Sequence, residues 1–111
     1  MELLSPSLEQ LIKEIVAVNH AWKVAKDLFQ ENSGLAQSLR ELKTRLQVRL
    51  LRCYSPNFVY LIEHQNTEND EPLYSLQLVS PIEGFKDAAH LPIRVAQEVL
   101  SSTEIQKFSN N

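Results

Sequence analysis

The chain has 111 residues, 43% of them hydrophobic and 23% charged, a balance that excludes an intrinsically disordered chain. Its net charge of −3 gives no overall attraction to nucleic acid or to an anionic membrane. A single cysteine excludes an intrachain disulfide scaffold, and the sequence shows neither a signal-peptide pattern nor an apolar stretch that would span a bilayer. We therefore expect one soluble, cytoplasmic domain over residues 1–111 that is not bound to a membrane.

The first predicted element is a long helix over residues 7–31. Its apolar residues recur at helical spacing, and they are Leu8, Leu11, Ile12, Ile15, Val16, Trp22 and Phe29. Ser7, with Gln10 three residues later, is typical of a helix start. Gly34 suits a left-handed cap at the end of the helix. Further apolar residues around Ile15 predict that more than one face of this helix is buried.

Residues 35–54 support two interpretations. A leucine seam with steps of four, three and four residues indicates an amphipathic helix, and it comprises Leu35, Leu39, Leu42 and Leu46. Residues 46–50 then alternate between apolar and polar, which is strand spacing. The segment is either one helix to about residue 53, or a helix to about residue 44 followed by a strand over residues 46–54. We favour the strand, because the stretch leads directly into a turn at residues 55–57.

Two further strands are predicted over residues 58–62 and 73–79. The first is rich in β-branched and aromatic residues, and the second places Tyr74, Leu76 and Leu78 on one face. A polar, acidic loop over residues 65–72 separates them. The two strands are therefore expected to form a hairpin.

The C-terminal part is predicted to be helical. Pro81 and Gly84 indicate a loop, and a third helix begins at about His90 with Pro92 in its first turn. Ser101 with Glu104 forms a capping box that starts a short last helical turn. The predicted order is α-α-β-β-β-α with this C-terminal turn, which indicates a small α+β domain in which helices cover an antiparallel three-stranded sheet.

The sequence contains no motif for catalysis, for a cofactor or for a metal. The three histidines, His20, His64 and His90, lie on different predicted elements and lack the spacing of metal ligands. Cys53 lies in an apolar stretch and is expected to be a small core residue. We therefore expect no catalytic residues, no cofactor, no metal site and no enzymatic activity.

One stretch is strongly basic in a protein that is acidic overall. Interrupted only by Glu41, it contains Arg40, Lys43, Arg45, Arg49 and Arg52. In a helix, Arg45, Arg49 and Arg52 share one face, whereas in a strand Arg52 points away from the other two. This candidate interaction patch suits phosphates or an acidic partner, and a solvated helix face is the plainer interpretation.

The favoured function is a non-enzymatic protein–protein interaction module, such as a small adaptor, regulator, assembly factor or accessory subunit, that binds a protein partner and forms a homodimer. One alternative is a nucleic-acid-associated regulator that uses the basic stretch over residues 40–52. Another is a small ligand-binding domain or enzyme whose site is assembled in space from His64, His90, Glu63 or tyrosines.

Overall fold

The computed structural model describes residues 7–64 and 71–109. Across these residues the elements are α1 (Leu8–Phe29), α2 (Gly34–Tyr54), β1 (Val59–His64), β2 (Leu73–Ile82), β3 (Phe85–Pro92), α3 (Ile93–Val99) and α4 (Ser102–Ser109). The α+β class and the order of helices and strands are confirmed, with the last turn extended into a helix of 8 residues. Residues 65–70 of the expected acidic loop lie outside the described residues.

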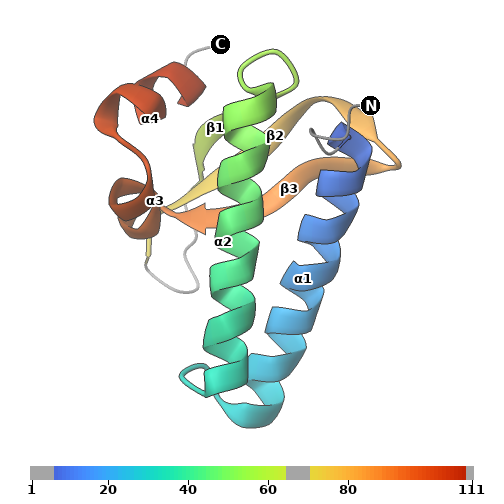
Figure 1. The fold of residues 1–111 in the computed structure, drawn as a ribbon, viewed down its shortest axis with the longest axis vertical. Coiled ribbons are helices and arrows are strands. Elements are labelled where there is room, and N and C mark those ends of the chain that lie inside the picture. The colour runs from blue at the N-terminus through green and yellow to red at the C-terminus, as the bar shows by residue number, and fades with distance from the viewer. Residues whose placement is uncertain (1–6, 65–70, 110–111) are drawn as a thin grey trace, which may run out of the picture.

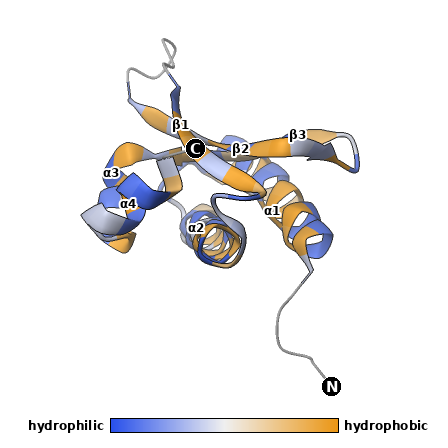
Figure 2. Cartoon of the chain, turned by 90° about the horizontal axis from the view of Figure 1, so that it is seen from above, coloured by the Kyte–Doolittle hydropathy of each residue, from blue (hydrophilic) through white to orange (hydrophobic). Residues whose placement is uncertain are grey.

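The three strands form an antiparallel sheet in the order β1-β2-β3. The predicted hairpin between the first two is confirmed, with Leu61 opposite Leu76. A two-residue turn joins β2 to β3, and its residues Glu83 and Gly84 have φ angles of 53° and 84°. Positive φ at both positions is the geometry that matches the twist of a tight hairpin. The helices lie on one side of this sheet (Figure 2).

The strand expected over residues 46–54 is wrong, because α2 continues without a break to Tyr54. The alternation that suggested a strand ends at Leu50 and Leu51, which are neighbours in the sequence and are both fully buried. A helix with a wide buried face accommodates this pattern, whereas a strand would turn one of the two leucines to the opposite side. No glycine or proline interrupts the helix between Gly34 and Pro56.

The third strand is β3, in a segment where the sequence predicted a loop and the start of a helix. It lacks β-branched residues, so strand propensity gives little signal there. Its pairing is also irregular: Ser75 lies opposite His90 but Gln77 lies opposite Asp87, which leaves one extra residue in β3. Helix α3 starts directly after this strand, with Pro92 as its N-cap and not within its first turn.

Serine side chains begin the two long helices. The Ser7 hydroxyl accepts the N–H of residue 10 at 3.0 Å, and the Ser33 hydroxyl accepts the N–H of residue 36 at 3.2 Å. The left-handed residue that ends α1 is Gln30, with φ 86°. Gly34, which was expected in that role, is instead the first residue of α2.

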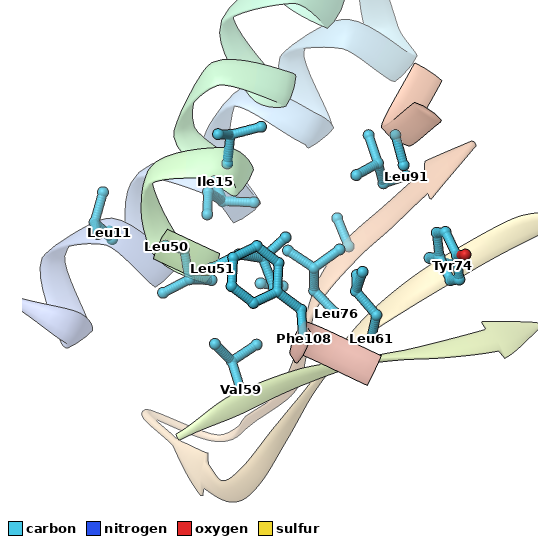
Figure 3. Packing of buried hydrophobic residues seen from close by; sticks show 14 of the residues in the cluster. Leu11, Ile15, Leu50, Leu51, Val59, Leu61, Tyr74, Leu76, Leu91 and Phe108 are labelled. Carbon is cyan, nitrogen blue, oxygen red and sulfur yellow. The ribbon is translucent and has the colours of Figure 1, made fainter. Parts of the chain in front are cut away.

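The core lies between the helices and one face of the sheet (Figure 3). Its largest fully buried side chains come from α1, α2 and all three strands, and they are Leu11, Ile12, Ile15, Leu50, Leu51, Leu61, Leu76, Leu91, Gln47 and Val59. Helix α4 contributes Phe108, which is only 3% exposed. The predicted capping box of α4 is confirmed: Ser101 N–H donates to Glu104 Oε1 and Glu104 N–H donates to Ser101 Oγ, both at 3.1 Å.

The hairpin of α1 and α2 is longer than the sheet that it covers (Figure 1). The halves of both helices near residues 29–34 extend beyond the strands, whereas the other halves pack on them. The uncovered half of the hairpin therefore presents side chains that are not part of the core.

Candidate functional site

The structure divides the predicted basic patch between different sides of α2. Arg45 and Arg49 are exposed on the helix surface. Arg52 binds α4, because its Nε donates to Glu104 Oε2 at 2.9 Å and its Nη2 donates to Glu104 Oε1 at 3.1 Å. These bonds from Arg52, followed by the bond from the Ser101 N–H, hold the pKa of Glu104 below its ordinary value. Arg52 thus has a structural partner, and the patch is not one continuous surface.

The remaining two patch residues, Arg40 and Lys43, line a groove of about 610 Å³ between the helical hairpin and the end of the sheet next to α3. We call it the basic groove. Its walls come from α1, α2, the start of β2, the end of β3 and α3, and they comprise Asn19, Trp22, Lys23, Lys26, Glu31, Arg40, Lys43, Glu71, Leu73, His90, Pro92 and Arg94.

Lys43 is the centre of this groove and is only 4% exposed. Its Nζ donates to Asn19 Oδ1 at 3.2 Å and lies 4.3 Å from the centroid of the Trp22 ring. Lys26 Nζ lies 4.4 Å from the same centroid, so two cations contact one indole. Burial, and then repulsion from Lys23, Arg40 and Lys26, lowers the pKa of Lys43 to about 8.

The positive charge of the groove is poorly compensated. Arg94 pairs with Glu71 at 3.1 Å, which leaves Glu31 as the remaining acidic lining residue. Within residues 7–64 and 71–109, the groove's lysines and Arg40 form no salt bridge. The indole N–H of Trp22 is also buried without an acceptor in the described part of the chain. The groove is therefore suited to a negatively charged ligand.

Two histidines that the sequence placed on separate elements come together on the sheet. The rings of His64 and His90 have centroids 5.0 Å apart. Burial, followed by the neighbouring His64, lowers the pKa of His90. Glu63 does not join them. It pairs with Tyr74, and the side chains of this pair point to the face of the sheet opposite to that of His64. Among the described residues no group of three potential metal ligands is present.

The two other residues considered for chemistry lie at the surface. Cys53 is exposed and unpaired, so the expectation of a buried thiol is wrong. It lies next to the exposed Arg52 at the end of α2, outside the buried face of that helix. His20 is exposed on α1.

The leucine seam of α2 is a second uncovered feature. Leu35 is 53% exposed and Leu42 is 38% exposed, while Leu39 and Leu46 are partly exposed. The helix instead buries the adjacent face, which carries Ala36, Lys43, Gln47, Val48, Leu50 and Leu51. Leu46 packs against the core, so the part of this pattern that the chain leaves uncovered is the stretch with Leu35 and Leu42.

The contribution of α1 to the basic groove was not predicted from the sequence. Trp22, Lys23 and Lys26 lie about as far before the connection at residues 30–33 as Arg40 and Lys43 lie after it. In an antiparallel helical hairpin, residues equally distant from the turn face one another. This symmetry is the signal that relates the two basic segments, once both are known to be helical.

No family model, curated protein or solved structure matches this chain. None of the helices in the described ranges is both long enough and apolar enough to cross a membrane. The functional argument therefore rests on the geometry of the surface.

Proposed function

We propose that this protein is a non-enzymatic interaction module that forms a two-fold homodimer through the leucine seam of α2. The observation that carries this proposal is the exposure of Leu35 and Leu42 within a regular four-three-four pattern. This spacing is the one by which helices pack side by side, with each leucine inserted between side chains of a facing helix. A leucine seam of this kind is therefore usually covered by another helix.

A second copy of α2 fits this seam better than an unrelated helix would. In a two-fold interface the same patch appears on both partners, and the seam consists of one residue type throughout. In an antiparallel pair, the end of each helix that carries Arg45 and Arg49 lies beside residues 35–38 of the other helix. Residues 35–38 carry no charge. Parallel pairing would place each arginine beside its own copy, so the antiparallel dimer is favoured.

Such a dimer presents two basic grooves, one on each copy of the chain. A pair of identical binding surfaces on a rigid frame is suited to an adaptor or assembly factor, because two linked contacts bind more tightly than one. We place this activity in the cytoplasm, since a chain with a single cysteine has none of the intrachain disulfides that are common in small secreted domains.

Light scattering coupled to size-exclusion chromatography tests the proposal. We expect the wild-type chain to be a dimer at micromolar concentration. Changing Leu35→Glu together with Leu42→Glu introduces buried carboxylates at the seam and should weaken self-association at least about 100-fold. Far-UV circular dichroism of this variant should stay unchanged, because both side chains are already exposed in one copy.

The matched control is Leu28→Glu, which changes an even more exposed leucine of α1 outside the seam. It should leave the dimer intact. A wild-type protein that stays monomeric at high concentration contradicts the proposal, as does a seam variant that still forms dimers.

A further inference from the structure

We propose that the basic groove binds a small molecule through its phosphate group, which Lys23, Arg40 and Lys43 hold. The site does not depend on the proposed dimer, because each copy of the chain supplies all the groove residues. Its basis is the position of these cations relative to the sheet and to one another.

The groove continues a surface that elsewhere forms the core. Along the half of the hairpin covered by the sheet, α1 and α2 bury apolar residues such as Ile15 and Leu51. Closer to the connection at residues 30–33, where the groove lies, the hairpin carries Trp22, Lys26 and Lys43 in their place. Apolar side chains would be the stable choice if nothing bound there, and a buried lysine flanked by further cations is costly without an anion.

A phosphate group fits the charge of this groove better than a carboxylate does. Lys23, Lys26, Arg40 and Lys43 all line the groove, and Lys26 and Lys43 both contact the Trp22 ring. A dianion with several acceptor oxygens satisfies more than one of them at a time. The guanidinium of Arg40 presents paired donors, and the ammonium groups act as point charges beside it.

The shape favours a small ligand over a nucleic acid strand. About 610 Å³ lies within the usual range for a small-molecule pocket. Glu31 and the Glu71–Arg94 pair also lie on the walls, so the groove lacks the continuous track of positive charge that an extended polyanion follows. Trp22, Leu73 and Pro92 offer an apolar wall for the part of the ligand that carries the phosphate.

Trp22 is the only tryptophan of the chain and borders the site, so its fluorescence reports occupancy. The full chain is titrated with inorganic phosphate, inorganic pyrophosphate and a single-stranded deoxyribonucleotide 12-mer at constant ionic strength, with sodium chloride as the blank. We expect saturable binding of phosphate and pyrophosphate. Lys23→Gln with Arg40→Gln should weaken it at least tenfold.

The matched control removes the same charge from the exposed side of α2, with Arg45→Gln and Arg49→Gln. It should change the affinity less than twofold. The proposal is overturned if the two pairs of substitutions weaken phosphate binding equally, or if neither phosphate nor pyrophosphate binds saturably. Binding of the 12-mer that both pairs weaken equally also overturns it, because it indicates a diffuse nucleic-acid surface.

A second test measures the affinity of the wild type and of the Lys43→Met variant for pyrophosphate by isothermal titration calorimetry at pH 7 and pH 9. The wild-type affinity for pyrophosphate should be lower at pH 9 than at pH 7, because Lys43 loses its proton over this range. The charged or titratable groups near Lys43 are Lys23 and Lys26 of α1, Arg40 of α2 and His90 of β3. The Lys43→Met variant should bind more weakly at pH 7 and should lose this part of the pH dependence. An unchanged pH profile in that variant contradicts a role for Lys43.

Discussion

At the level of single residues, Lys43 is a charged side chain held in an unfavourable environment. Its hydrogen bond is to the neutral Asn19, and burial, followed by repulsion from three cations, lowers its pKa to about 8 from an ordinary value of 10.5. The contact of Lys43 with the Trp22 ring offsets part of this cost. Charges in such settings are more often kept for binding than for stability.

We predict that Lys43→Met stabilises the protein at pH 7 by up to about 3 kcal/mol, from a pKa difference of roughly two and a half units. Between about pH 8 and 10.5 the unfolded chain binds more protons at this site, so wild-type stability rises with pH there. The advantage of the Lys43→Met variant should therefore be full at pH 7 and shrink toward pH 10.5.

Urea denaturation of both proteins at pH 7 and pH 10 measures this difference. Lys107→Met serves as the control, because Lys107 is exposed on α4 and does not act on Lys43, so its replacement should change the free energy of unfolding by under about 0.5 kcal/mol. A Lys43→Met variant less stable than the wild type at pH 7 would show that the contacts with Asn19 and Trp22 outweigh the cost of the charge.

At the scale of elements, Gln47 connects α2 to the irregular part of β3. Its buried Nε2 donates to the carbonyl of Ala88 at 3.0 Å and to that of His90 at 3.2 Å. Between them Ala89 has φ 69°, and its N–H donates to Asp87 Oδ1 at 3.0 Å. The amide of Gln47 thus satisfies carbonyls that the bulge withdraws from the ladder.

Replacing Gln47 by leucine should destabilise the protein by about 1–2 kcal/mol, because the buried carbonyl of Ala88 and the half-buried carbonyl of His90 lose their donor. Gln47 Oε1 is buried and accepts no hydrogen bond in the described part of the chain, so removing this oxygen offsets part of the destabilisation. Gln77→Leu is a matched control, since Gln77 Nε2 donates to the Lys86 carbonyl at 3.2 Å at the surface. Urea denaturation of both variants decides the matter: equal losses would mean that burial of the Gln47 bonds has no special weight.

The elements that the sequence predicted well are those with local signals. The start of α1 depends on Ser7 and its neighbours, and the capping box of α4 depends on Ser101 and Glu104. By contrast, β3 is held by pairing with β2 and by Gln47, which is more than 40 positions away in the sequence. No window of local sequence contains that information.

At the scale of the whole molecule, one buried cluster includes residues from every helix and strand of the described chain. Leu11 and Ile15 at one end of α1 belong to it, whereas Trp22 lies toward the end that extends past the sheet (Figure 1). Helix formation is cooperative along its length, so we expect the projecting half to unfold together with the core.

This expectation predicts that urea unfolding followed by Trp22 fluorescence and by far-UV circular dichroism gives one common midpoint at a fixed protein concentration. The concentration is held fixed because self-association makes the midpoint depend on it. A fluorescence transition at lower urea would show that the outer hairpin unfolds separately, contrary to the single domain expected from the sequence.

Local sequence patterns were enough to predict the α+β class, the order of helices and strands, the long first helix and the β1–β2 hairpin. Each of these follows from hydrophobic periodicity and capping residues within a short window. The sequence also identified Arg40 and Lys43 as part of an unusually basic stretch. It did not separate them from Arg45, Arg49 and Arg52.

That separation depends on the packing of α2 in the folded chain, because a helix distributes five nearby cations around its axis and each then meets a different neighbour. Arg52 meets Glu104, Lys43 meets Trp22 and Asn19, and Arg45 remains at the surface. The tertiary structure likewise decided the identity of the third strand and the exposure of the leucine seam. All three depend on which segments far apart in the chain pack together, and local periodicity does not encode that.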